Sequence, residues 1–599
     1  MMGVLRFLEL IHSKIDQELY LIHETLGRKN LNNYHDGGEA ILEAFRNLDV
    51  DYVISSPGSE WPSLWEAMAR QKRDGTAGPV YMDCGHEILA VTMASAYTHI
   101  TGRMQAVILH AGAGLMQGSM AVSAARAMET PMVVMSGESL GYGETEFEPG
   151  SQWYRNLSIV GGSQRLLEPV VKWAQQVPAP ETLYESVVRA GELAQRNPRG
   201  PTYLCVSMET MTHEWLKPDA LRKSPPSPKF QPIPDEIDKI AALIAHAECP
   251  LISVENAGPD RGAFDALVEL AELMSIPVVE GQGAFFANFP KSHDLYMGTN
   301  INPFLEETDL ALLVESRTPW YPPSNTPKNA EIVAIGINPL KSHMVYQVMN
   351  ANHYLEGDVA ATLRLLTEAL RRLGIDATKM SERRARWRAK HEEWCEGLRA
   401  AEDNSVDRDV ITVPLLMKTL RDVMPAETSY VDETIVHSGA IRNHAMWDDS
   451  LSFFRAPSGL GQGLGYALGV KLAMPERNVV MTIGDGTFMY NPVVPAIAFA
   501  DEHELPLLII VANNAKYAAM QHTHDQFYPA GTSITTNDYY GVNIKGPKYE
   551  EAASMVGGYG KLVRNPADLA PALREALRSI QAGKTAILNV DMPDKGALQ

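Results

Sequence analysis

The residues best suited to chemistry form a Gly-Asp-Gly tripeptide, Gly484–Gly486, at the end of the apolar run NVVMTI. After the 26 residues 487–512, the pair Asn513-Asn514 ends a second apolar run. The carboxyl ends of strands in an open α/β sheet form one binding edge, so Asp485 and Asn514 are expected to face a single site. A carboxylate and an amide oxygen suit a hard cation such as Mg²⁺ or Ca²⁺.

The residues after Asp485 suit a ligand that brings phosphate oxygens to this cation. Gly486 permits close approach of a diphosphate, and the hydroxyl and amide of Thr487 can donate to it. Either motif alone would indicate only a tight turn, but two such motifs at two strand ends favour a site. The nearby GLGQGLGYALG (459–469) follows no convincing strand and fits G-x-G-x-x-G badly, which disfavours a NAD-dependent oxidoreductase.

The elements that must position these residues are alternating strands and helices. Short apolar runs such as AVILHA (106–111), MVVMSGE (132–138) and LPLLIIVANN (505–514) are typical of buried parallel strands. Between these runs lie segments whose apolar residues have helical spacing. This alternation of strands and helices predicts three doubly wound parallel-sheet α/β domains.

Two segments divide the chain. The proline-rich stretch 217–235 indicates a linker, and the charged stretch 381–408 indicates a solvated helix between domains. We therefore expect domains at 30–216, 230–380 and 405–599.

Composition excludes several classes of protein. The 599 residues are 45% hydrophobic and 21% charged, with a formal net charge of −21, which disfavours nucleic-acid and membrane partners. The four cysteines are scattered singly, so neither a disulfide framework nor a zinc site is expected. Residues 1–27 lack the pattern of a signal peptide, and a cytoplasmic protein is expected.

The spacing GDG–26 residues–NN resembles the signature of thiamine-diphosphate enzymes. The likeness extends over nearly the whole chain and is greatest to the benzoylformate decarboxylase and acetohydroxyacid synthase group. It implies a pyrimidine-binding (PYR) domain, a central domain and a diphosphate-binding (PP) domain, in that order. It also implies that Asp485, Asn514 and the main-chain oxygen of Lys516 bind the metal, with Gly484 among the residues around the cofactor.

The same resemblance implies a glutamate that activates the cofactor by bonding to its pyrimidine ring. The segment GHEILAVTMASAYTHITGR (85–103) is similar to the family's glutamate helix, which makes Glu87 the candidate. A carboxylate beside an apolar run has the raised proton affinity that this role requires. Without the metal motif, Glu87 would be an ordinary acidic residue at a helix start.

Further positions are similar to the family's substrate and cofactor contacts. Ser59 matches the serine that faces the substrate carboxylate, and His110 matches a histidine that transfers protons. Leu460 matches the apolar residue that holds the cofactor bent. His437 and Ser438 fall where the family contacts the diphosphate. Structural roles, as a turn serine, a core histidine and a packing leucine, are the alternatives.

The sequence also departs from the family pattern. Where benzoylformate decarboxylase carries a second active-site histidine, this chain has Pro322 or a neighbour. His522 and His524 could replace it or be exposed loop residues, so the substrate stays open.

The resemblance implies a lyase that decarboxylates a 2-oxo acid or transfers the resulting acyl group to an acceptor. The alternatives are an acetolactate-synthase-like transferase and a relative that binds the cofactor without turnover. FAD stays open, although the middle block shows no flavin motif. The family builds each site between two subunits, which implies a homodimer or homotetramer.

Overall fold

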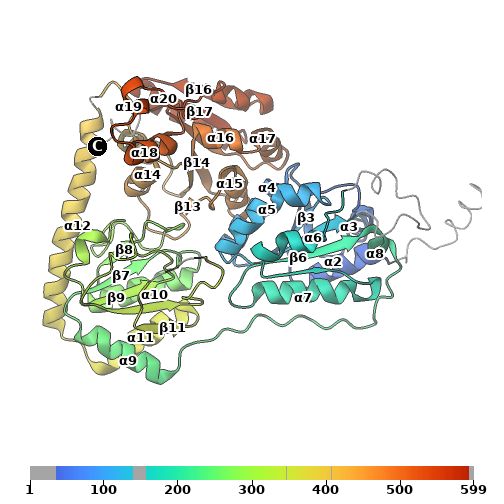
Figure 1. Ribbon diagram of the computed structural model, residues 1–599, viewed down its shortest axis with the longest axis horizontal. Coiled ribbons are helices and arrows are strands. Elements are labelled where there is room, and N and C mark those ends of the chain that lie inside the picture. Colours follow the sequence, from blue (N-terminus) through green and yellow to red (C-terminus); the bar gives the residue numbers. More distant parts are fainter. Residues whose placement is uncertain (1–34, 139–156, 346, 348, 407, 593–599) are drawn as a thin grey trace, which may run out of the picture.

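The computed structural model describes residues 35–138 and 157–592, apart from 346, 348 and 407. The N-terminal segment, for which no signal peptide is expected, lies outside the described residues. Three α/β domains follow one another along the chain (Figure 1). Each contains one parallel sheet with helices against it, so the predicted fold class is confirmed.

The first domain contains a sheet of six parallel strands in the order β2-β1-β3-β4-β6-β5. Strands β3 and β4 are buried along their whole length, as their apolar runs predict. The elements are α2 (Gly37–Asn47), β1 (Tyr52–Ser56), α3 (Pro62–Asp74), β2 (Val80–Asp83), α4 (Glu87–Thr101), β3 (Gln105–Leu109), α5 (Ala113–Ala127), β4 (Met132–Glu138), α6 (Ser163–Leu167), β5 (Trp173–Gln176), α7 (Leu183–Gln195), β6 (Pro201–Ser207) and α8 (Met208–Thr212).

The central domain contains five parallel strands in the order β11-β10-β9-β7-β8. The chain order reverses between β7 and β9, which is where ligands commonly bind in such sheets. The elements are α9 (Pro234–His246), β7 (Pro250–Val254), α10 (Arg261–Met274), β8 (Val278–Glu280), β9 (Leu310–Val314), β10 (Glu331–Gly336), β11 (His353–Glu356) and α11 (Val359–Leu373).

The third domain repeats the topology of the first. Its order β13-β12-β14-β15-β17-β16 is the same arrangement of six parallel strands, shifted along the chain. The elements are α13 (Val413–Val423), β12 (Thr428–Glu433), α14 (Ser438–His444), β13 (Phe453–Arg455), α15 (Gly463–Ala473), β14 (Asn478–Gly484), α16 (Asp485–Tyr490), α17 (Val493–Glu502), β15 (Leu508–Asn513), α18 (Ala518–Phe527), α19 (Thr532–Thr536), β16 (Tyr559–Val563), α20 (Pro566–Gln581) and β17 (Ala586–Asp591).

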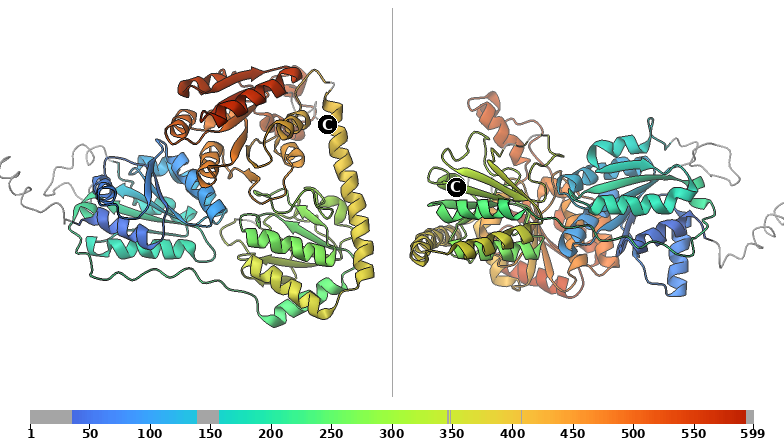
Figure 2. Two further views of the ribbon diagram at one scale, coloured as in Figure 1. Left: turned by 180° about the vertical axis from the view of Figure 1, so that it is seen from behind. Right: turned by 90° about the horizontal axis from the view of Figure 1, so that it is seen from below.

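The two predicted connecting segments differ in structure. Residues 217–233 contain neither helix nor strand and run as a long connection to α9, which Figures 1 and 2 show passing along one side of the molecule. Residues 381–406 of the charged segment lie in α12 (Ala377–Val406), a single helix of 30 residues that spans from the central domain to the third.

The first and third domains share one hydrophobic core. Helices α4 and α15 pack closely, because Gly465 and Gly469 of α15 lie directly against α4. A methyl group on Gly469 would overlap the backbone of Met93. Buried side chains of both sheets continue through this contact, for example Val107 and Val479. No helix among the described residues is long and apolar enough to cross a membrane.

Candidate active site

A cavity of about 340 Å³ lies at the carboxyl ends of β14 and β15 in the third domain. Loops after β12, before α15 and after β15 complete its wall. Eight of the residues that the sequence predicts for the cofactor or metal line it: His437, Leu460, Gly484, Asp485, Gly486, Thr487, Asn514 and Lys516.

Asp485 is the buried anion of this cavity. It begins α16 directly after β14, and burial raises the pKa of its carboxyl to about 6, while backbone N–H groups of Gly486, Ala515 and Lys516 oppose that shift. Its Oδ2 atom has no hydrogen-bond partner among the described residues. A buried carboxylate oxygen without a donor requires a partner from outside the chain, and a cation meets that requirement.

The loop after β15 brings Asn514 and Lys516 to the same cavity. The Lys516 amide donates to Asn514 Oδ1 at 3.1 Å, and Lys516 forms a backbone bridge with Asn543. Among the described residues, no three histidine, cysteine or acidic side chains cluster as a metal site. A metal here would therefore depend on one carboxylate, amide and main-chain oxygens, and oxygens of its ligand.

Gly486 has a packing role as well. A methyl group at this position would overlap the Tyr517 ring, so Gly486 is also what allows the loop after β15 to close on α16. A glycine at position 486 would therefore serve two purposes: it leaves space for a diphosphate, and it lets the loop after β15 pack against α16.

The loop that carries Leu460 is fixed by a buried carboxylate. Glu433, at the end of β12, accepts from Gly461 N at 3.0 Å, Gln462 N at 2.8 Å and Asn491 Nδ2 at 2.7 Å. Burial raises the pKa of Glu433 to about 7. The Asn491 amide also donates to Thr487 O at 3.0 Å, so these bonds connect the Leu460 loop with α16.

Two predicted diphosphate contacts differ in position. His437 is buried and lines the cavity, whereas Ser438 does not. The Ser438 hydroxyl is buried and has no hydrogen-bond partner among the described residues. His522 and His524 lie on α18, are partly exposed, and do not line the described cavity.

The predicted residues of the first domain form a second group. Glu87 is the first residue of α4, and His110 follows β3. Both face Gly114, where an added methyl group would lie 2.7 Å from Glu87 Oε1 and 2.7 Å from His110 Cβ. Ser59 lies in the exposed turn between β1 and α3.

His110 is held by a residue that the sequence analysis did not assign. The buried carboxylate of Glu60 lies 2.9 Å from His110 Nδ1 and also accepts from Ala111 N at 2.7 Å. This hydrogen bond raises the pKa of His110 against the opposing effect of burial. It also directs Nδ1 to Glu60 and leaves Nε2 for another partner. In the sequence, the one feature that pointed to Glu60 was its place directly after Ser59.

Within one chain the two groups stay separate, because no described residue of the first domain lines the cofactor cavity. The first domain nevertheless reaches the Leu460 loop. A methyl group on Gly459 would lie 3.2 Å from Met120 Sδ of α5.

Comparison with known sequences identifies the family to which this three-domain chain belongs. Three family models of thiamine pyrophosphate enzymes match in order: the N-terminal TPP binding domain at residues 35–147, the central domain at 237–366, and the C-terminal TPP binding domain at 442–590. The chain belongs to the thiamine pyrophosphate enzymes. The predicted family is therefore confirmed.

Relatives of known name cover almost the whole chain. An acetolactate synthase large subunit from Mycobacterium tuberculosis is 26% identical over 571 residues, which is 92% of this chain and 95% of the relative. A benzoylformate decarboxylase from Pseudomonas aeruginosa is 26% identical over 565 residues, 90% of this chain and 96% of the relative. A probable 2-ketoarginine decarboxylase from the same organism is 24% identical over 571 residues, 91% of each chain.

Solved structures share the fold. The benzoylformate decarboxylase of Polynucleobacter necessarius matches with a TM-score of 0.74 at 19% identity, covering 94% of this chain and 99% of that one. A 4-hydroxybenzoylformate decarboxylase of Rhodococcus jostii RHA1 matches with a TM-score of 0.72 at 20% identity, covering 93% and 99%.

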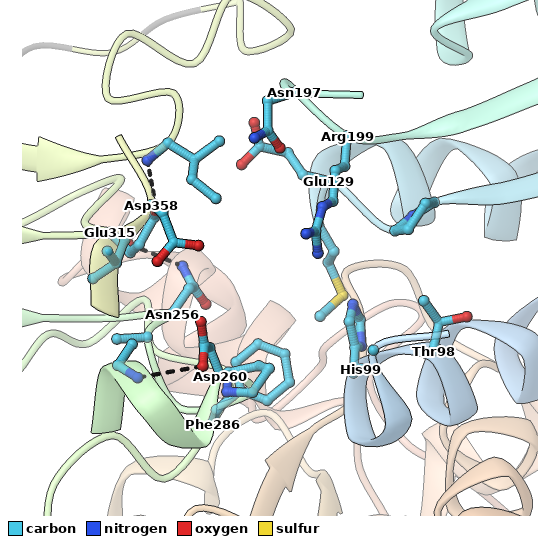
Figure 3. Close-up of a pocket in the computed structure, with 18 of the residues that line it drawn as sticks. Thr98, His99, Glu129, Asn197, Arg199, Asn256, Asp260, Phe286, Glu315 and Asp358 are labelled. Atoms are coloured by element: carbon cyan, nitrogen blue, oxygen red, sulfur yellow. Dashed lines mark hydrogen bonds between the residues drawn. The ribbon is translucent and has the colours of Figure 1, made fainter. Parts of the chain in front are cut away.

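A larger cavity of about 450 Å³ separates the first domain from the central domain (Figure 3). Glu129 and Arg199 face Asp260, Glu315 and Asp358 across it. The cavity lies at the carboxyl edge of the central sheet, where a nucleotide cofactor such as FAD would be sought.

Two helix N-termini at that cavity are capped by aspartates, although the basic residues Arg199, Lys229, Arg261, Arg317 and Lys341 also line it, so FAD stays open. Asp260 accepts from Gly262 N at 2.8 Å and thereby caps α10, and Asp358 accepts from Ala361 N at 3.0 Å and caps α11. These carboxylates occupy the helix N-termini where phosphates would bind.

Proposed function

We propose that this thiamine pyrophosphate enzyme decarboxylates a 2-oxo acid and releases or transfers the resulting acyl group. The observation that carries the proposal is the cavity that joins Asp485, Asn514 and Leu460, with Glu87 and His110 grouped in the first domain. The names of the relatives support the same class, since they include decarboxylases and acetolactate synthases.

The bound cofactor supplies an electron-accepting ring that makes loss of CO₂ from a 2-oxo acid possible. The chain holds it through a divalent metal, Mg²⁺ in this proposal. Asp485 Oδ2, Asn514 and the main-chain oxygen of Lys516 bind the ion, because this oxygen set suits a hard cation. Gly486 and Thr487 contact the diphosphate.

The first domain supplies acid–base groups. Glu87 hydrogen-bonds the pyrimidine ring, and His110 exchanges protons with the reacting substrate through Nε2. Glu60 is a positioning residue, because it fixes the His110 ring and favours its protonated form. Ser59 contacts the substrate carboxylate.

The enzyme is proposed to act as a homodimer or as a pair of dimers. Exposed large apolar side chains gather around the cavity, including Ile435, Tyr490 and Met520, which are 53%, 59% and 52% exposed. Apolar side chains gathered in this way are typical of an interface. A first domain from a partner subunit covering this surface would bring Glu87 to the cavity.

The test is a 2-oxo acid panel with protein loaded with thiamine diphosphate and Mg²⁺, with CO₂ release and organic products followed together. We expect CO₂ from at least one 2-oxo acid, and none from Asp485→Ala. Free aldehyde would indicate a decarboxylase, and a 2-hydroxy ketone or 2-hydroxy-2-methyl-3-oxo acid a ligase. Cofactor binding without CO₂ release across the panel would refute the proposal and favour a non-catalytic relative.

A further inference from the structure

A third cavity, of about 370 Å³, lies between the central domain and the third domain. It shares Thr434, Ile435 and Leu460 with the cofactor cavity, so the two spaces adjoin beside the Leu460 loop. Its volume is within the range of small-molecule sites. Of the residues predicted to hold the cofactor and the metal, Leu460 alone lines this second space.

Arg317 enters this cavity from the central domain. Its side chain is only 14% exposed, its Nη2 donates to Gly283 O at 3.0 Å, and its guanidinium lies over the Phe285 ring at 4.4 Å. Its ion pair among the described residues is a long one, 3.9 Å from Nε to Glu255 Oε2. That carboxylate is already bonded by the amides of Arg317 and Thr318 at 2.6 and 3.2 Å.

Arg455 enters the same cavity from the end of β13. Its Nη1 donates at 3.4 Å to Gln282 O, and it has no carboxylate within 4.0 Å among the described residues. Burial lowers the pKa of both guanidinium groups; the charges of Glu255, Glu129 and Glu315 raise the pKa of Arg317, and the charge of Arg455 lowers it. The two cations therefore lie close enough to repel each other.

Two acids, Asp432 and Glu433, line the same wall, but neither forms an ion pair with Arg317 or Arg455 within 4.0 Å. Asp432 Oδ1 accepts from Thr434 N at 3.1 Å and Thr482 Oγ1 at 2.9 Å, and its charge raises the pKa of Arg455 by less than burial lowers it. Glu433 is turned toward the backbone of the Leu460 loop. Arg317 has Glu255 nearby, whereas Arg455 has no ion pair among the described residues, so a bound anion would chiefly offset the cost of burying Arg455.

We propose that this cavity holds the far end of a 2-oxo acid that carries a second carboxylate, and that Arg317 and Arg455 bind that carboxylate. The planar guanidinium fork matches a carboxylate with two parallel hydrogen bonds. The proposal rests on the proposed function and narrows it to dicarboxylic 2-oxo acids. The dicarboxylic acid is either the molecule that loses CO₂ or the acceptor of the acyl group.

The experiment compares two substrates that differ only at the far end, 2-oxopentanedioate and 2-oxopentanoate, in loaded wild-type enzyme and in Arg455→Met. We expect wild type to prefer the dicarboxylic acid. The variant should lose roughly 10- to 100-fold in kcat/KM for it, the equivalent of one charged hydrogen bond, and little for 2-oxopentanoate. Arg455→Lys should fall between them, because it keeps the charge but loses the fork.

Three measurements make the outcome decisive. Arg477→Met is the matched control, since Arg477 is a little-exposed arginine of the same domain that bonds Ser452 at 3.4 Å and lines neither cavity. Calorimetry with glutarate, which cannot react, should show binding to wild type and weakened binding to Arg455→Met. Supplying each acid as acceptor, with a fixed second 2-oxo acid as donor, identifies which molecule the arginines bind.

The results that overturn the proposal differ from those that overturn the function. Equal loss for both substrates in Arg455→Met would mean that the arginines bind the carboxylate that leaves as CO₂. A wild-type preference for monocarboxylic acids as both donor and acceptor would also overturn it. Absence of CO₂ release from every 2-oxo acid would instead refute the proposed function.

Discussion

The contact between α4 and α15 can be tested at Gly465. A methyl group there would overlap Thr92 Oγ1 and would lie 3.1 Å from Leu89 Cα. Thr92 Oγ1 cannot move freely, because it donates to Ile88 O at 2.7 Å. Overpacking of this kind costs about 1–3 kcal/mol, and replacing a helical glycine by alanine returns about 1 kcal/mol.

Gly465→Ala is therefore expected to destabilise the protein by a net ~0–2 kcal/mol. Gly439→Ala is the matched control, because Gly439 lies in α14 with nothing within 4 Å of an added methyl group, and it should stabilise the protein slightly. Thr92→Ala should partly rescue Gly465→Ala, since it removes the overlapping oxygen but leaves the contacts with Leu89 Cα and the Cβ of residue 92.

The assay is the midpoint of urea unfolding for the two single variants and the rescued double variant, with thiamine diphosphate affinity measured in parallel. Affinity should fall in Gly465→Ala and partly recover in the double variant, because α4 begins at Glu87 and α15 follows the Leu460 loop. If Gly465→Ala were as stable as Gly439→Ala, the close packing of these helices would be wrong.

Three further predictions concern the chemistry. Glu87→Gln should retain the cofactor but slow exchange of its C2 proton, followed by NMR after acid quench, by ~10²–10⁴-fold; exchange at the wild-type rate would exclude Glu87 as the activator. If protonated His110 is the active form, activity falls as pH rises through its pKa; since Glu60 raises that pKa, Glu60→Gln should move this fall to lower pH, and an unmoved pH profile would contradict the role of Glu60. Mixed dimers of Glu87→Ala with Asp485→Ala should regain activity toward half of wild type, and no recovery in a verified mixed dimer would mean that each site is built within one chain.

The sequence predicts the strands of this fold better than their arrangement. Apolar runs ended by polar residues locate β14 and β15, because both strands are buried in a parallel sheet. The shared strand order of the first and third sheets is not visible in such runs, since it depends on pairing between distant segments. The segment GLGQGLGYALG shows the same limit. Its Gly465 and Gly469 allow α15 to approach α4, a packing reason that no local pattern contains.

The sequence likewise predicts some residues of the candidate site and misses others. Motif spacing leads to Asp485, Asn514 and Leu460, which line one cavity. The carboxylates that hold such residues, Glu60 and Glu433, have no recognisable spacing, because each acts on a segment that folding brings to it. Glu60 is 50 residues from His110, and Glu433 is 28 residues from Gly461. Burial and hydrogen bonds identify them, and both are properties of the folded chain.

The residues proposed to bind the cofactor and those proposed to select the substrate come from different domains. The predicted cofactor and proton-transfer residues come from the first and third domains, whose sheets share one strand order. Arg317 comes from the central domain, which has a different strand order, and lines a space beside Leu460 that the predicted metal ligands do not line. Changes in the central domain could therefore alter which 2-oxo acid is accepted while leaving the metal site intact. Arg317→Met should accordingly change the preference between 2-oxopentanedioate and 2-oxopentanoate without changing thiamine diphosphate affinity, and a parallel loss of both would show that the two tasks are not separable.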